Sequence, residues 1–281
     1  MQEEKKYETS LAAHYGRPNL NNELFTTLEK AGRQIASYKD AISFDQFHMR
    51  GQEATRELAQ LAGLAKEQHV LDLGCGIGGA ARILAAEYGC KVTGLDMMEE
   101  FIHTATALTR KAGLADRVFF QTGNMLNLPF EDNLFDVAWS QHTLMNIEDK
   151  ARLLSQIRSV LRPQGRLALY EVTQGDNLPI KYPVQWASDE SISFLLPADQ
   201  MKQDIEAAGF KILHWQDVTG ECLQWFQNIV TKMKQRPAGA PPPLGLNLVI
   251  GPTAAEKARN TARNLQEDRI RVFYGVCENG S

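Results

Sequence analysis

The chain has 281 residues, of which 43% are hydrophobic and 23% are charged, and its net charge is −4 at pH 7. This length allows one large core and is short for two independent domains, so we expect one domain with additions. The acidic balance and the lack of any block of like charge argue against nucleic acid as a partner. The sequence has no apolar N-terminal signal region and no run of about eighteen apolar residues, so we expect a cytoplasmic protein with no membrane partner.

The N-terminal part of the chain is helical in pattern. Apolar residues recur at helical spacing over Leu20–Ala31 and Ala54–Ala62. We expect residues 1–50 to form a helical cap rather than part of the main core.

A glycine-rich turn follows the first short apolar run. Val70–Leu73 predicts a buried strand, Gly74–Gly79 a tight turn that lets the backbone approach a ligand, and Ala80–Glu87 a helix. The next strand, Lys91–Leu95, ends at Asp96, whose carboxylate can accept hydrogen bonds from both hydroxyls of a ribose. These features predict a nucleotide-binding βαβ unit. The glycine spacing also satisfies the dinucleotide pattern GxGxxG, so by itself it leaves the nucleotide open.

Strand and helix patterns continue to alternate as far as Val218, which predicts a parallel sheet with helices on both faces. The further expected elements are a helix over Glu99–Lys111, strands over Val118–Gln121 and Phe135–Trp139, a helix over Glu148–Leu161, a strand over Arg166–Glu171, a helix over Pro197–Ala208 and a strand over Lys211–Val218. Because ligands bind at the carboxyl ends of such strands, we expect Asp96, Asn124, Met125 and the residues after Trp139 to share one crevice.

The alternation ends after Val218. An amphipathic helix is expected over Glu221–Gln235, a stiff proline-rich connector over Arg236–Pro243, a second helix over Thr253–Asp268 and a strand over Arg269–Cys277. The four cysteines are widely spaced and form no CxxC pair, so we expect neither disulfides nor a metal site.

Four segments together resemble a known family. Asp72 stands two residues before Gly74, Gly123–Phe130 resembles a loop that covers an adenine, Phe135–Trp139 resembles the family's fourth strand, and Leu161–Gly165 resembles the turn before its fifth. These are similar to class I S-adenosyl-L-methionine (SAM)-dependent methyltransferases. The similarity extends to the small-molecule branch with sarcosine/dimethylglycine and phosphoethanolamine N-methyltransferases, and it favours a methyltransferase over an NAD-dependent enzyme.

The resemblance implies an α/β fold with a Rossmann-like, seven-stranded, mostly parallel sheet whose last strand inserts antiparallel beside the sixth. It divides the chain into a helical cap (1–50), a SAM-binding core (51–218), a helical lid (219–268) and the last core strand (269–281). The lid would lie above the carboxyl ends of the strands.

The implied cofactor is SAM. Asp96 would hold its ribose, the glycine turn and Gln141 would lie beside its methionine part, and Asn124 with Met125 would flank its adenine. The full set of expected cofactor-binding residues is Asp72, Gly74, Cys75, Gly76, Asp96, Met97, Asn124, Met125 and Gln141. Cys75 is interpreted as a small packed side chain rather than a reactive thiol.

The segment after the fourth strand supplies catalytic candidates. Ser140–Lys150 resembles the matching segment of phosphoethanolamine methyltransferases, but Asn146 stands where that family has a histidine of its acid/base machinery. An amide takes up no proton near neutral pH, which argues against phosphobase activity. His142 is one candidate base and His48, in a segment that resembles an acceptor-side segment, is the other. Each has an alternative interpretation, as a residue that shapes the loop (His142) or packs and caps a helix (His48).

Four residues are expected to bind the acceptor: Tyr15, Asn146, Tyr182 and Trp186. Tyr182 and Trp186 lie in the long loop after the fifth parallel strand, where aromatic side chains suit a substrate wall and can hold a cationic amine. The alternatives are that Trp186 packs the loop onto the sheet and that Tyr15 packs the cap.

The sequence therefore predicts SAM-dependent methylation of a small metabolite, with an amine favoured because Ala254–Arg263 resembles the lid of amine-methylating members. One alternative is O- or C-methylation of an aromatic or natural-product acceptor, with His48 or His142 as base. Another is a SAM-binding protein without catalysis, since Asn124 and Asn146 stand where relatives more often have ionisable residues. The sequence leaves a homo-oligomer open.

Overall fold

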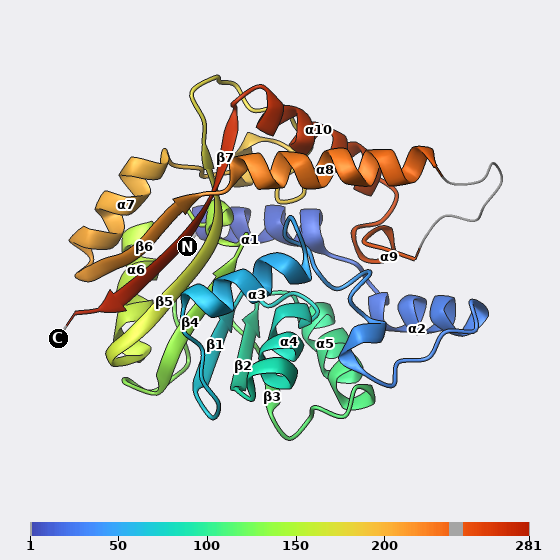
Figure 1. The fold of residues 1–281 in the computed structure, drawn as a ribbon, viewed down its shortest axis with the longest axis horizontal. Helices are drawn as coiled ribbons and strands as arrows, with labels where there is room; N and C mark the ends of the chain where they lie inside the picture. Colours follow the sequence, from blue (N-terminus) through green and yellow to red (C-terminus); the bar gives the residue numbers. More distant parts are fainter. Residues whose placement is uncertain (1, 236–243, 281) are drawn as a thin grey trace.

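A computed structural model describes residues 2–235 and 244–280, whose seven strands form one sheet (Figure 1). The strands are β1 (His69–Leu73), β2 (Lys91–Asp96), β3 (Val118–Thr122), β4 (Phe135–Gln141), β5 (Leu161–Gln174), β6 (Phe210–Asp217) and β7 (Ile270–Asn279). Their order across the sheet is β3-β2-β1-β4-β5-β7-β6. The first five are parallel, and β7 inserts antiparallel between β5 and β6. The predicted fold class is confirmed.

Helices cover both faces of this sheet. They are α1 (Gln2–Tyr15), α2 (Leu20–Lys30), α3 (Gln52–Leu61), α4 (Gly79–Tyr88), α5 (Glu99–Lys111), α6 (Lys150–Val160), α7 (Ala198–Ala207), α8 (Thr219–Lys234), α9 (Asn247–Ile250) and α10 (Ala254–Gln266), with short 3-10 turns at Tyr38–Asp40, Leu144–Asn146 and Glu190–Ile192. Successive strand residues point to opposite faces, so Val70 packs in one apolar cluster with α3 and α4 while Leu71 packs in another with α6 and α7.

The predicted elements agree with these bounds to within a few residues, and Glu99–Lys111 agrees at both ends. The largest difference is at β5, which begins at Leu161 rather than Arg166. Leu161 pairs with Phe135, and the register then shifts so that Arg166 pairs with Val137. The expected turn is therefore an irregularity inside a longer strand. The predicted connector at residues 236–243 lies outside the described residues, and α9 was not predicted.

Segments far apart in the sequence meet at the carboxyl ends of the strands. Helices α8 and α10 pack on each other and lie together along one end of the sheet in Figure 1. Helix α2 packs on α5, toward the right of the same view. No helix within the described ranges is long and apolar enough to cross a membrane. The division into cap, core and lid stays a prediction.

A buried ion pair fixes the segment between α2 and α3 over the glycine turn. Arg82 Nη2 of α4 lies 2.8 Å from Asp45, and both side chains are 1% exposed. A Cβ atom on Gly79 would lie 2.1 Å from the carbonyl oxygen of Asp45, so only glycine permits this approach. The ion pair and the close contact hold the neighbouring Phe47 and His48 beside the strand ends.

Candidate active site

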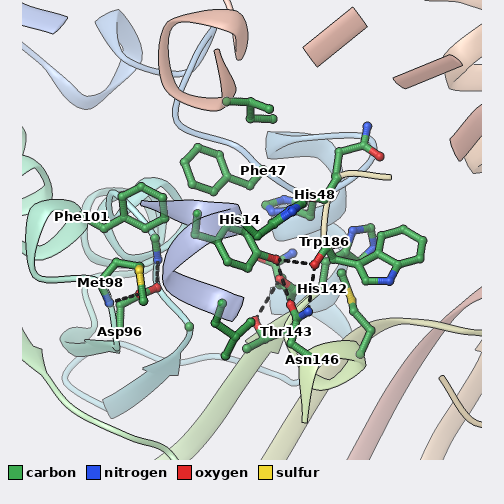
Figure 2. A pocket seen from close by; sticks show the side chains of 18 of the residues that line it. His14, Phe47, His48, Asp96, Met98, Phe101, His142, Thr143, Asn146 and Trp186 are labelled. Carbon is green, nitrogen blue, oxygen red and sulfur yellow. Dashed lines mark hydrogen bonds between the residues drawn. The ribbon is translucent and has the colours of Figure 1, made fainter. Parts of the chain in front are cut away.

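A cavity opens at the carboxyl ends of β1, β2 and β4, between the sheet and residues of α1, α8, α9 and α10. Figure 2 shows Asp96, Met98 and Phe101 on one side of it, and Trp186, His142 and Asn146 on the other. The predicted site residues that line it are Gly74, Gly76, Asp96, Met97, Asn124, Met125, Gln141, His48, His142, Tyr15, Asn146 and Trp186. Three predicted residues, Asp72, Cys75 and Tyr182, do not line it.

Asp96 is held by backbone donors at the end of β2. The N–H of Gly76 donates to Oδ2 and the N–H of Met98 donates to Oδ1, both at 2.9 Å. Burial raises the pKa of this carboxyl. Each oxygen has a further lone pair, so the carboxylate can accept two more hydrogen bonds from a ligand. This geometry fits the two hydroxyls of the SAM ribose.

The glycine turn has no room for side chains. Gly74 and Gly76 have φ values of 68° and 52°, in the left-handed region that favours glycine. A Cβ atom would lie 2.4 Å from Thr143 at Gly74 and 3.0 Å from the Phe47 ring at Gly76. The bare backbone of this turn therefore forms part of the cavity wall, where the methionine part of SAM is expected.

Asp72 and Cys75 lie behind this wall. Asp72 is 3% exposed, and its Oδ2 has no hydrogen-bond partner among the described residues. Burial, together with the nearby Asp96, raises the pKa of Asp72 to about 7. Burial also raises the pKa of the Cys75 thiol well above its usual value, so Cys75 is an inert packed side chain.

Gln141 has its amide fixed in one orientation. Its Oε1 accepts hydrogen bonds from Trp139 Nε1 at 3.0 Å and from Thr55 Oγ1 at 3.1 Å. Its buried Nε2 has no partner in the part of the chain that the structure describes. Gln141 can therefore offer N–H donors to a ligand oxygen. Asn124 differs, because its Oδ1 accepts from the N–H of Leu126 at 2.9 Å and shapes the turn after β3.

The two candidate bases lie together, with ring centroids 6.1 Å apart, and His48 is buried whereas His142 is half-buried. Burial lowers the pKa of His48 to about 4, and its Nε2 contacts the Gly51 carbonyl at 3.0 Å. Burial and the neighbouring His48 lower the pKa of His142 well below its usual range. The His142 ring stacks on Tyr170, with 4.6 Å between centroids, and its Nε2 has no hydrogen-bond partner within the described ranges. Both imidazoles are neutral at pH 7.

Asn146 joins three segments around the cavity, as the dashed lines in Figure 2 show. Its Nδ2 donates to the carbonyls of Trp186 at 2.8 Å and Ile192 at 2.7 Å. Its Oδ1 accepts from the Tyr15 hydroxyl at 2.8 Å, and its backbone carbonyl accepts from Tyr7. The Asn146 amide and the Tyr15 hydroxyl therefore hold the cap against the loop after β5.

The two aromatic residues of that loop lie in different places. Trp186 lines the cavity, is 2% exposed, and donates from Nε1 to Ser193 Oγ at 3.0 Å. Tyr182 is partly buried and packs against the main core cluster. Trp186 thus faces the cavity and also holds its own loop together, and its contact with the acceptor stays a prediction.

Glu171 was missed by the sequence analysis. It stands in β5, is 1% exposed, and accepts hydrogen bonds from Ser140 Oγ at 2.6 Å and from the N–H groups of Thr143 and Leu144. Burial raises the pKa of Glu171 to about 7. This carboxyl fixes the loop that presents His142 and Asn146. No local motif marks it, because its partners lie about thirty residues away.

Comparisons with known proteins agree with this geometry. Residues 71–169 match the family model described as a methyltransferase domain. The chain is 36% identical over 125 residues to a glycine/sarcosine/dimethylglycine N-methyltransferase of Actinopolyspora halophila. This aligned region covers 43% of this chain and 22% of that protein. It is 28% identical over 187 residues to the O-methyltransferase resE of Aspergillus sclerotiorum, and this aligned region covers 66% of this chain and 70% of that protein.

A solved structure shows the same fold. The phosphoethanolamine N-methyltransferase 2 of Haemonchus contortus, in complex with SAM, superimposes with a TM-score of 0.73 at 20% identity, covering 95% of this chain and 61% of that one. The sheet, the strand-end cavity and the family match define residues 71–169 as a SAM-dependent methyltransferase domain. The predictions of this recognition and of SAM as its cofactor are confirmed.

Proposed function

We propose that this chain transfers the methyl group of SAM to a small molecule, and that the acceptor atom is an amine nitrogen. SAM supplies an electrophilic methyl group on its sulfonium. The residues of this chain align the acceptor with it and exclude water, which is what an in-line displacement requires. In this proposal Asp96 holds the ribose and the cavity beyond the glycine turn holds the acceptor.

The protonation states of the cavity carry the amine proposal. An amine attacks through its lone pair, so it must be neutral when it reacts. His14, His48 and His142 line the cavity, and burial lowers the pKa of each, to about 4 for His14 and His48. Among the described lining residues, Asp96 is the one carboxylate. The same environment lowers the pKa of a bound amine and keeps it reactive.

The direct test is to incubate the purified protein with SAM and a pool of small amines, amino acids, phenols and thiols, and to detect methylated products by mass spectrometry. We expect an N-methylated product. Methylated phenols without methylated amines would contradict the amine assignment. A calorimetric titration with S-adenosylhomocysteine (SAH) separates the cofactor site from the acceptor site, because SAH binding needs no acceptor.

O-methylation is the second candidate, and one observation favours it. His142 Nε2 is buried without a partner in the described residues, so its lone pair can accept a hydroxyl proton. Changing His48 and His142 together to alanine distinguishes the candidates. Loss of hydroxyl methylation with unchanged amine methylation would assign the histidines to an O-methyl transfer. A chain that binds SAH and methylates nothing in the pool would support the non-catalytic alternative.

A further inference from the structure

Lys257 is a buried cation that faces the cavity and has no carboxylate partner among the described residues. It stands in α10, lines the cavity and is 6% exposed. Within the described part of the chain its one polar contact is with His14 Nε2, at 3.4 Å. Burial lowers the pKa of Lys257. Burying an ammonium without a partner is unfavourable, because its lost hydration is not replaced, so this arrangement needs an explanation.

His14 does not satisfy Lys257. Its Nε2 also lies 2.9 Å from the carbonyl oxygen of Gln185, which can only accept a hydrogen bond. Nε2 therefore carries a proton, and it has no lone pair to offer to Nζ. The remaining ring nitrogen, Nδ1, is engaged with Ser188 Oγ at 2.8 Å. The N–H donors of Lys257 remain available to a ligand.

Two other basic residues show how this chain otherwise satisfies such groups. Lys150 is also 6% exposed, but its Nζ donates to the carbonyls of Ile147 at 2.6 Å and Phe194 at 2.7 Å. Arg17 lines the same cavity, but it pairs with Glu23 at 3.0 Å and donates to a backbone carbonyl. Lys257 is thus set apart by its unpaired donors and by facing the cavity.

We propose that the methyl acceptor carries an anionic group, a carboxylate or a phosphate, that binds Lys257, together with an apolar portion that packs on the neighbouring side chains. Helices α8 and α9 contact α10, and apolar side chains of both, among them Trp225, Phe226 and Val249, line the same cavity. An anion at Nζ replaces the lost hydration of the ammonium with a charge-assisted hydrogen bond. This inference rests on the proposed function, because it assigns a substrate class to the same cavity.

A pair of dyes tests the charge preference without any catalysis. 8-Anilinonaphthalene-1-sulfonate and N-phenyl-1-naphthylamine share an apolar body, and only the first carries an anionic group. We expect the SAH-bound protein to bind the sulfonate about ten- to a hundredfold more tightly, the range of a hydrogen bond to a charged group. Equal affinity for the two dyes would overturn the proposal.

Variants place this preference at Lys257. Lys257→Met should bring the two affinities together, and Lys257→Arg should retain most of the difference. Lys232→Met is the matched control, because Lys232 lies exposed on α8 and the change in net charge is the same. A sulfonate preference that survives Lys257→Met, or that Lys232→Met removes equally, would contradict the assignment.

The acceptor itself provides the second test. Each carboxylic acid in the methylation pool is paired with its amide, and each phosphate monoester with its free alcohol. We expect the acidic member of a pair to be methylated at least tenfold faster than the neutral member. Whether the carboxylic acids or the phosphate monoesters are methylated shows which anionic group the acceptor carries. Equal turnover of both members would overturn this inference while leaving the methyltransferase proposal intact. Failure of SAH to bind would instead contradict the proposed function.

Discussion

Replacing Asp96 by asparagine tests the cofactor site at its most specific contact. Both carboxylate oxygens already accept a backbone N–H, from Gly76 and from Met98, each at 2.9 Å. Each has one lone pair left for a ribose hydroxyl. In Asp96→Asn the NH₂ group must face one of the two N–H donors, so one backbone bond is lost along with the charge and with one acceptor atom.

The expected loss follows from those contacts. A hydrogen bond to a charged group contributes about 1.5–3 kcal/mol, and Asp96→Asn weakens two of them, so we expect SAH binding to weaken by about 3 kcal/mol, roughly a hundredfold in Kd. Calorimetric titration with SAH measures this directly. Glu99→Gln is the matched control, because it removes the same charge at an exposed position three residues from Asp96. This substitution should leave the Kd for SAH unchanged.

If Asp96→Asn binds SAH within about threefold of the wild type while its melting temperature is unchanged, Asp96 does not hold the ribose. Tighter binding of NAD than of SAH by the wild type would contradict the site assignment as a whole.

Three further variants test what holds the site together. Arg82→Met leaves its buried carboxylate partner unpaired and should lower the free energy of unfolding in urea by about 3–5 kcal/mol, whereas a loss under 1 kcal/mol would show that the pair is unimportant. The Glu171 carboxyl, whose pKa burial raises to about 7 from 4.5, keeps its proton longer in the folded chain than in the unfolded one. Its contribution to stability is therefore full below pH 4.5 and is lost as the pH rises to 7, so the stability of the wild type relative to Glu171→Gln should fall between pH 4.5 and about pH 7. A constant difference would contradict the raised pKa. Gly76→Ala places a Cβ atom 3.0 Å from the Phe47 ring and should weaken SAH binding. Gly113→Ala is the control, because Gly113 also has a positive φ but has open space around it, so this change should lower stability by about 1–2 kcal/mol and leave SAH binding unchanged. Equal SAH affinities in the two variants would contradict the steric argument.

The sequence predicted the parts of the site that a continuous segment encodes. The glycines of the turn and Asp96 lie within one βαβ unit, where strand, turn and helix signals follow one another in register. Their places at the strand ends then follow from the parallel order of the sheet. For the same reason Gln141 and His142, at the end of β4, were expected beside them.

The rest depends on contacts between distant segments. Arg82 pairs with Asp45 across 37 residues, and His14 meets Lys257 across 243. A charged residue in such a pair has no local pattern that separates it from a solvated surface residue. Asn146 shows the same limit, because the hydrogen bonds by which its amide joins the cap to the loop at Trp186 have no signal in the local sequence, while its expected contact with the acceptor stays a prediction.

The acid–base properties of the histidines also constrain the two candidate reactions differently. A hydroxyl acceptor must give up its proton by the time its oxygen is methylated. His142 has a pKa well below its usual range, so it is a weak base, and it can assist only a hydroxyl that is itself acidic. A neutral amine attacks with its proton count unchanged and can lose a proton later, to solvent. Its reaction therefore needs no base in the cavity, and its rate should follow the titration of the amine rather than that of either imidazole. The neutral histidines of this cavity are thus compatible with a wide range of amines but with few alcohols.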